Sequence, residues 1–290
     1  MEDSSAPVVI DGSALTIDDV VAVAYGRAEV VAGPDLAARM APARQRVKQV
    51  IARDETVYGL TTGFGALSGT RIPPERAWDL QYDLIRSHAA GVGPLLDTPT
   101  VRAMLLCRAR TLAQGHSGVR TKIVERLIDM VNAGMIPAGP SQGSVGASGD
   151  LAPFAHLALP IIGEGLVLTA KGAEPAGDAL ARLGWEPLDL KAKEGLSLLN
   201  GTEGMLAQGC LAVHRARHLV DAADAACALS VEALMGSSRP FDPRIHELRP
   251  HPGQVTSAAH IASLLEGSAI DASHHDDFAH KVQDAYSLRC

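Results

Sequence analysis

Hydrophobic residues recur with a helical period along most of this chain. Between residues 98 and 115 they are three or four positions apart, at Val101, Met104, Leu105, Ala109 and Leu112. Pro99 lies near the start of this stretch and Gly115 at its end, as is typical of helix boundaries. The spacing therefore predicts a helix over these residues.

The same reasoning predicts three further helices. Residues 121–134 carry a stripe at Val124, Leu127, Ile128 and Val131. Thr121 is expected as its N-cap and Gly134 as its end. Thr16 and Asp19 are expected to open a helix near the N-terminus. From Thr202 to Met235 the chain has no proline and is rich in alanine and leucine, so a helix of about 30 residues is expected, which implies a bundle.

Strand patterns are scarce. The stretch GLVLTAKG at 165–172 is the one good strand candidate, and we expect it to form half of a small hairpin. No internal repeat or low-complexity tract is present. The sequence therefore predicts a mainly α fold.

Composition narrows the classes of function. The chain has 290 residues, 47% of them hydrophobic, and a net charge of −7 without a basic cluster, which argues against nucleic-acid binding. Its four cysteines form no CxxC pair, so neither a disulfide framework nor a thiolate zinc site is indicated. The N-terminus lacks the basic start of a signal peptide, and no apolar run reaches the ~18 residues of a membrane span. We expect a cytoplasmic protein with no membrane partner.

A glycine-rich stretch, VYGLTTGFGALSG at 57–69, interrupts the helical pattern. Its glycines indicate a mobile or tightly turned segment, a candidate lid that carries Tyr58. The spacing fits neither GxGxxG nor a P-loop, so a phosphate site is not indicated. A plain linker remains the alternative.

A second loop, GSVGASGDLAP at 143–153, places the tripeptide Ala147-Ser148-Gly149 before a predicted helix start. Asp150 is a capping residue type and Pro153 fits a first helical turn. If the nitrogen of Gly149 is pressed onto the carbonyl of Ala147, ring closure with loss of two waters gives a methylidene-imidazolone. This ring is an electrophile that no side chain provides, and a helix N-terminus favours electron density building up on it. From these residues alone, an ordinary capping loop remains the alternative.

Five motifs together decide between these alternatives: VYGLTTGFGALS, SHAAGVG, GSVGASGDLAPFAHLALPIIGEG, EGLSLLNGT and VQDAYSLRC. Their order and content, from about residue 14 to residue 290, resemble the aromatic amino acid ammonia-lyases, and the histidine-specific branch most closely. The resemblance implies an α-helical homotetramer with active sites drawn from three subunits. It also implies elimination of ammonia without an added cofactor or metal.

The resemblance implies a domain organisation as well. Residues 1–200 would form an N-terminal domain with the Ala-Ser-Gly loop, and residues 201–290 the first part of a central helical bundle. Members of the family are longer, so the remainder of the bundle is expected to be absent from this chain. Whether the chain is active or tetrameric by itself stays open, because it would expose apolar helix faces.

Residue roles follow from the same resemblance. Ala147, Ser148 and Gly149 would form the methylidene-imidazolone autocatalytically. Tyr58 would be the base that removes a β-proton, for which its phenol must be activated by nearby cations or hydrogen bonds. Arg289 would grip the substrate carboxylate through its guanidinium fork.

The polar wall of the site and its specificity would come from other motifs. Asn200 would hydrogen-bond the substrate or the ring, and Gln283 and Tyr286 would complete the wall. The pair Ser87-His88 has the form of the histidine-specific members, and an imidazole can exchange a hydrogen bond with a substrate imidazole. We therefore expect L-histidine as substrate and trans-urocanate as product.

Two departures leave alternatives open. Glu203 stands where histidine lyases usually have glutamine, which adds a possible negative charge near the site, and Ala285 replaces a usual proline. A tyrosine or phenylalanine ammonia-lyase, an aminomutase, and a catalytically silent helical assembly subunit remain the alternatives.

The stretch SHHDDFAHKVQD suggests a metal site at first sight. Its candidate ligands are His274, His275, Asp276, Asp277 and His280. The spacing matches no zinc template and the charges are typical of a solvated loop, so no metal is expected.

Overall fold

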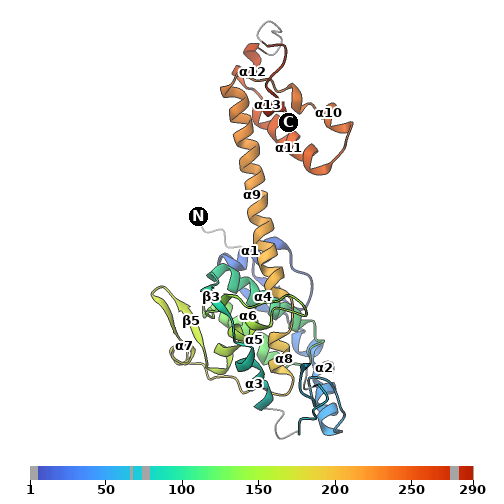
Figure 1. The fold of residues 1–290 in the computed structure, drawn as a ribbon, viewed down its shortest axis with the longest axis vertical. Helices are drawn as coiled ribbons and strands as arrows, with labels where there is room; N and C mark the ends of the chain where they lie inside the picture. Colours follow the sequence, from blue (N-terminus) through green and yellow to red (C-terminus); the bar gives the residue numbers. More distant parts are fainter. Residues whose placement is uncertain (1–5, 66–67, 74–78, 275–280, 290) are drawn as a thin grey trace. The chain divides into compact units, whose positions relative to one another are not determined.

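The computed structural model describes residues 6–65, 68–73, 79–274 and 281–289 (Figure 1). The chain divides into two compact units, one up to Ala212 and one from Val213. The helices of the first unit are α1 (Ile17–Ala24), α2 (Leu36–Ala52), α3 (Asp79–His88), α4 (Thr98–Ala113), α5 (Thr121–Asn132), α6 (Leu151–Ala158), α7 (Ala176–Leu183) and α8 (Glu194–Leu199). Helix α9 (Glu203–Ala233) starts in this unit, and the 3-10 helix η3 (Leu159–Ile162) follows α6 directly.

The second unit is also helical. Its described residues form the remainder of α9, the 3-10 helix η4 (Arg239–Phe241), and the helices α10 (Pro243–Glu247), α11 (Pro252–Leu265), α12 (Ala269–His274) and α13 (Tyr286–Arg289). The mainly α fold predicted from the sequence is therefore confirmed.

Helices α1, α4, α5 and α9 confirm the periodicity argument. Thr16 caps α1 as expected, since its hydroxyl accepts from the backbone N–H of Asp19 while the Asp19 carboxylate accepts from the N–H of Thr16. The expected cap of α5 is wrong. Arg120 is the N-cap residue and Thr121 is already helical. The reason is that the carboxylate of Glu194 accepts the N–H of Arg120, so a distant side chain rather than a local one organises this helix start.

The core of the first unit is built around α4 and α5, which pack against each other. Helix α4 is buried on most of its circumference, whereas α5 buries one stripe, at Ile123, Val124, Leu127, Ile128 and Val131. A central helix that is covered all round can bury a polar residue only with partners. Arg108 of α4 is such a residue, and it lies close to the candidate site.

The described part of the first unit also contains three two-stranded sheets. The hairpin expected around residues 165–172 is confirmed as β5 (Leu166–Thr169) and β6 (Gly172–Pro175). Strand β1 (Val8–Ile10) pairs in parallel with β2 (Val30–Ala32), and β3 (Val92–Leu95) pairs antiparallel with β4 (Pro140–Gln142). The sequence missed these two pairs because strands of three or four residues are too short to show an alternation.

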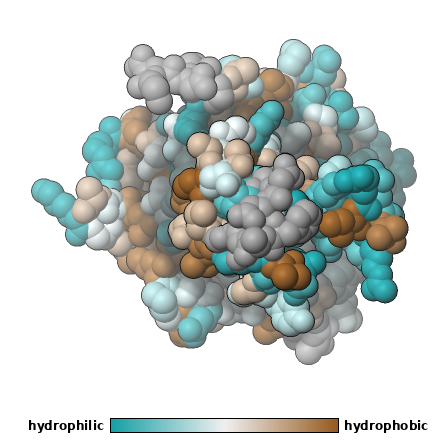
Figure 2. All heavy atoms as spheres, turned by 90° about the horizontal axis from the view of Figure 1, so that it is seen from above, coloured by the Kyte–Doolittle hydropathy of each residue, from teal (hydrophilic) through white to brown (hydrophobic). Residues whose placement is uncertain are grey.

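The second unit has a small core of its own, formed by Ala228, Val231, Phe241, Ile261 and Leu265. Many large apolar side chains of the second unit are exposed. Leu219 is 72% exposed, Leu229 68% and Leu248 82%. Apolar and polar residues are interspersed on the face of the molecule shown in Figure 2.

Candidate active site

The Ala-Ser-Gly loop connects β4 to α6, and the helix start predicted after the tripeptide is confirmed. Ala147 and Ser148 are exposed, and Gly149 is buried. Gly149 has a φ of +140°, a conformation that residues with a side chain rarely adopt. The loop therefore offers its serine at the surface while its last residue is held inside the fold.

Gly149 is held by a turn from a distant part of the chain. The turn contains Asn200 and Gly201 and joins α8 to α9. A Cβ at position 149 would lie 2.7 Å from both the nitrogen and the oxygen of Gly201, far inside van der Waals contact. The neighbouring N–H of Asp150 donates a 2.7 Å hydrogen bond to the same Gly201 oxygen. The two backbones thus meet with no side chain between them.

Asp150 has a different role from the expected cap of α6. It occupies the N-cap position, but its side chain makes no capping bond to that helix. Its buried carboxylate accepts instead from the Ser144 hydroxyl at 2.6 Å and from the N–H of Met205 at 2.9 Å. Met205 lies in the first turn of α9. Asp150 therefore provides an acceptor for a backbone N–H that has no partner within α9, and it connects the Ala-Ser-Gly loop to the start of that helix.

His88 is the last residue of α3, and its tautomer follows from its partner. Nδ1 lies 2.8 Å from the carbonyl oxygen of Leu84, which can only accept, so Nδ1 carries a proton. In the neutral ring Nε2 is then an acceptor. Ser87 also donates to the Leu84 oxygen, at 3.1 Å. The predicted pair Ser87-His88 therefore presents one acceptor nitrogen.

The segment after His88 lies beside the start of the Ala-Ser-Gly loop through the β3–β4 pairing. A Cβ at Gly91 would lie 3.1 Å from the carbonyl oxygen of Gln142. The N–H of Gly91 donates to Nε2 of His156, on α6, at 3.0 Å. Burial lowers the pKa of His156 below its usual value of 6.5, so the ring stays neutral and continues to accept this bond.

Tyr58 lies on the glycine-rich loop and is 61% exposed. Its hydroxyl accepts from the N–H of Gly65 at 3.3 Å, and its ring meets Phe64 edge-on with centroids 6.1 Å apart. Gly59 has a φ of +68°, and a Cβ there would lie 3.0 Å from the side chain of Leu196 on α8. This packing anchors the loop to the helix that ends at Asn200.

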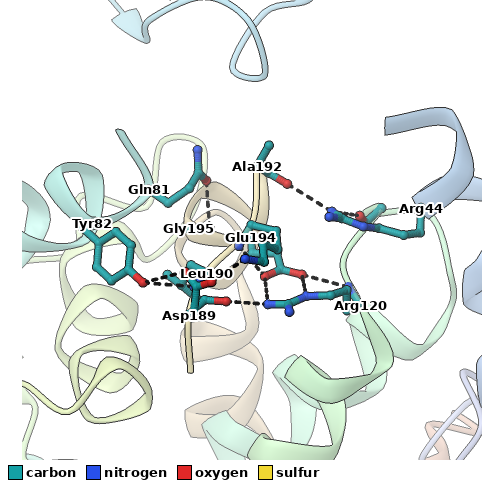
Figure 3. A network of polar contacts seen from close by, with 11 residues as sticks. Arg44, Gln81, Tyr82, Arg120, Asp189, Leu190, Ala192, Glu194 and Gly195 are labelled. Atoms are coloured by element: carbon teal, nitrogen blue, oxygen red, sulfur yellow. Dashed lines mark hydrogen bonds and ion pairs between the residues drawn. The ribbon is translucent and has the colours of Figure 1, made fainter. Parts of the chain in front are cut away.

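A polar network around α8 fixes the elements that carry His88 and Asn200 (Figure 3). Glu194, at the start of α8, is fully buried, and its carboxylate accepts from the guanidinium of Arg120 at 2.7 and 2.8 Å. The N–H of Gly195 donates to the side-chain oxygen of Gln81 on α3 at 3.0 Å. Tyr82 of α3 accepts the N–H of Leu190 at 3.1 Å. A buried hydrogen bond thereby joins α3 to α8, and a second, partly buried one joins α3 to the segment before α8.

The other predicted substrate-binding residues lie in the second unit. Tyr286 and Arg289 are the ends of the short helix α13, Gln283 precedes it, and all three are exposed. The structure brings Gly149 together with the Asn200 turn, and it places the His88 segment beside the same loop. Gln283, Tyr286 and Arg289 belong to the second unit.

The candidate metal ligands are only partly described. His274 ends α12, and its Nε2 lies 2.9 Å from the carbonyl oxygen of Gly236. His275, Asp276, Asp277 and His280 lie outside the described residues. Elsewhere in the described chain, no three histidine, cysteine or acidic side chains gather closely enough to hold a metal ion.

Burial raises the pKa of Cys107 to about 12, so this thiol stays protonated. No helix among the described residues has the length and apolar character needed to cross a bilayer.

Sequence reasoning missed two residues next to the site. His156 stands in the quoted motif but was given no role, because nothing local indicates that its partner is Gly91. Arg108 carried one signal only, a charge within an otherwise apolar stretch of a predicted core helix. Such a charge must find a buried partner, and its partners come from the Asn200 turn.

Comparison with known proteins agrees with these observations. A family model described as aromatic amino acid lyase matches residues 15–290. Histidine ammonia-lyase of Chloroflexus aurantiacus is 51% identical over 98% of this chain, which corresponds to 54% of that protein. Histidine ammonia-lyase of Gloeobacter violaceus is 50% identical over 98% of the chain and 55% of its own length. The chain thus spans about half the length of the curated relatives it matches.

Solved structures show the same fold. Tyrosine aminomutase from Streptomyces globisporus is 39% identical, with a TM-score of 0.92 over 98% of this chain and 56% of its own. Histidine ammonia-lyase from Trypanosoma cruzi is 41% identical, with a TM-score of 0.85 over 99% of this chain and 52% of its own. With a family match over nearly all of its length and relatives at about half identity, this chain belongs to the aromatic amino acid lyase family.

Proposed function

We propose that the chain belongs to a histidine ammonia-lyase, which eliminates ammonia from L-histidine to give trans-urocanate. The observation that carries the proposal is the tight packing of Gly149, at a φ of +140°, against the Gly201 backbone. A loop of small residues pressed in this way suits condensation with itself. Curated relatives named histidine ammonia-lyase at 44–51% identity support the choice of substrate.

The residues present fit a methylidene-imidazolone. Position 149 tolerates no side chain, Ser148 carries the β-hydroxyl that must leave, and Ala147 adds only a methyl group. Ala147, Ser148 and Gly149 would form and hold the ring. When formed, it supplies an electrophilic carbon next to the N-terminus of α6.

The chain's own residues would act around this group. Arg289 binds the substrate carboxylate, and the side-chain amide of Asn200 hydrogen-bonds the substrate. Tyr58 takes a β-proton onto its hydroxyl oxygen. His88 accepts a hydrogen bond at Nε2 from the imidazole N–H of the substrate, which a phenyl ring cannot offer. Gln283 and Tyr286 complete the polar wall.

We infer the assembly and location from the same relationship. The complete protein is a homotetramer whose active sites draw on several subunits, works in the cytoplasm, and needs no added cofactor or metal. The thiols of Cys107, Cys210 and Cys227, which are free in the described chain, suit a reducing compartment.

The test uses protein expressed from its complete coding sequence. It is incubated separately with L-histidine, L-tyrosine and L-phenylalanine, and the ultraviolet bands of urocanate, coumarate and cinnamate are followed together with released ammonia. Intact mass reports ring formation through the loss of two waters. The matched control is Ser148→Ala, which keeps the loop size but has no hydroxyl to eliminate. Urocanate and ammonia from the wild type alone support the proposal; a ring-free wild type without ammonia release refutes it.

A tyrosine aminomutase is the second candidate, favoured by the TM-score of 0.92 to that enzyme. The same incubations separate the two, because an aminomutase converts L-tyrosine into a β-amino acid and accumulates no free ammonia. Chromatography of the amino acids after incubation detects that product.

A further inference from the structure

The turn that packs against Gly149 also contacts α4. The guanidinium of Arg108 donates from Nη1 to the carbonyl oxygen of Asn200, at 3.2 Å. On the loop side, the N–H of Asp150 donates to the carbonyl oxygen of the next residue, Gly201. Two consecutive carbonyl groups are therefore fixed by donors from two distant segments. The peptide unit between them has little freedom to rotate.

Arg108 is placed by a buried set of contacts. It is 2% exposed, and its guanidinium carbon lies 4.3 Å from the centre of the Phe154 ring on α6. Its Nη2 lies 2.9 Å from Oε2 of Glu203, whose side chain is 7% exposed. Burial lowers the pKa of Arg108, whereas the charges of Glu203 and Asp150 raise it. The cation is thus held beside two carboxylates.

The same contacts explain why position 201 is glycine. A Cβ at Gly201 would lie 2.5 Å from Nη2 of Arg108 and would also collide with the carboxylate of Glu203. The ion pair fills the space in which a side chain would stand. Arg108 therefore lies directly behind the peptide that faces Gly149.

We propose that Arg108 is a positioning residue of the reaction, because it holds the Asn200–Gly201 peptide against Gly149, and that the buried ion pair with Glu203 keeps Arg108 in place. For its kinetic readouts the inference rests on the proposed function. Nη2 of Arg108 and Oε2 of Glu203 lie 2.9 Å apart, but neither atom has a hydrogen-bond partner among the described residues, so Glu203 acts on Arg108 through its charge.

The charge balance predicts different consequences for the loss of each partner. Arg108, Glu203 and Asp150 are all buried, and together they carry one positive and two negative charges. Glu203→Gln leaves Arg108 balanced by Asp150, whereas Arg108→Met leaves two buried carboxylates without a cation. The two substitutions are therefore expected to differ strongly, although both break the same ion pair.

The experiment compares variants of the protein expressed from its complete coding sequence. Arg108→Met should lower kcat for L-histidine by about tenfold or more, with KM changed by less than about threefold. Arg108→Lys should lie in between, since one ammonium group cannot contact both the Asn200 oxygen and the Glu203 carboxylate with the geometry of a guanidinium. Glu203→Gln should stay within about threefold of the wild type, because the charge of Asp150 still balances Arg108.

The matched control is Arg126→Met. Arg126 is also a buried arginine stacked on an aromatic ring, with its guanidinium carbon 5.1 Å from the centre of the Trp185 ring, but it contacts no part of the turn. It should lower the melting temperature as Arg108→Met does and leave kcat unchanged. An Arg108→Met variant that keeps the wild-type kcat, or an equal loss of kcat in both variants, overturns the proposal.

A readout that needs no activity separates this inference from the proposed function. Hydrogen exchange, followed by mass spectrometry, measures how fast the backbone amides of Asp150 and Met205 exchange. The Asp150 amide is bonded to the Gly201 oxygen, and the Met205 amide is bonded to the Asp150 carboxylate. Arg108→Met should speed their exchange at least about tenfold relative to Arg126→Met. If the wild type forms no ring, the proposed function fails and this comparison still decides the positioning role. Equal exchange in the two variants refutes it.

Discussion

The closest backbone approach in the site gives the sharpest prediction. In Gly149→Ala, the new methyl group would lie 2.7 Å from the nitrogen and the oxygen of Gly201. Both atoms belong to a backbone held by Asp150 and Arg108, so no flexible side chain can move away. The substitution should therefore push the Ala-Ser-Gly loop off the turn.

The magnitude has two parts. A side chain at the φ of +140° costs about 1–3 kcal/mol of backbone strain. The collision adds an overpacking cost of about 1–3 kcal/mol. Gly146→Ala, in the same loop, is the matched control. Its φ of +65° costs about 1–2 kcal/mol, and its nearest neighbour, Sδ of Met205, lies at an ordinary 3.7 Å.

The assay measures urea unfolding and intact mass for both variants. Gly149→Ala should lower the free energy of unfolding by about 2–6 kcal/mol and should show no loss of two waters. Gly146→Ala should cost no more than about 2 kcal/mol and should keep the ring. If Gly149→Ala forms the ring as completely as Gly146→Ala, the link between close packing and cyclisation is wrong.

Three further predictions test other parts of the site. Glu194→Leu should lower the free energy of unfolding by about 3 kcal/mol, because it removes the buried carboxylate that accepts from Arg120. Glu174→Leu, which breaks an exposed pair, should cost clearly less, and urea titrations compare the two variants. His156 should make the free energy of unfolding fall as the pH drops below about 6.5. Its pKa is lowered in the folded protein, so the unfolded chain binds the proton at a higher pH than the folded chain does. His156→Gln should lose this part of the pH dependence in the same titrations. His88→Leu should lower kcat/KM for L-histidine by about tenfold or more and leave the ring mass unchanged, as steady-state kinetics and intact mass will show; an unchanged kcat/KM contradicts the role of Nε2.

Periodicity predicted the helices well because their apolar stripes are local properties. The stretch from 121 to 134 appears as α5 with its predicted stripe buried, and the proline-free stretch from 202 appears as the 31-residue α9. Helix starts were less predictable. The start of α5 depends on Glu194, a residue far along the chain, and the start of α9 depends on Asp150. No local pattern could indicate either contact.

The candidate site shows the same division between local and distant causes. The sequence indicated Ser148 as the source of the hydroxyl and Gly149 as the unhindered nitrogen, because both properties belong to the residue types. It could not indicate what compresses the loop. The compression comes from Gly201, whose only signal in the sequence is its place in the motif around Asn200.

Glu203 illustrates why a departure from a family pattern needs a structure before it is interpreted. In the sequence it adds a negative charge near the site, and a change of substrate preference seemed a natural consequence. In the fold its Oε2 lies 2.9 Å from Nη2 of Arg108, in the space that a side chain at Gly201 would occupy. The adjacent cation largely cancels the electric field of the Glu203 carboxylate, so little of that field acts on a substrate. The substitution therefore bears first on how firmly the turn is held, and only through the turn on the chemistry of the loop.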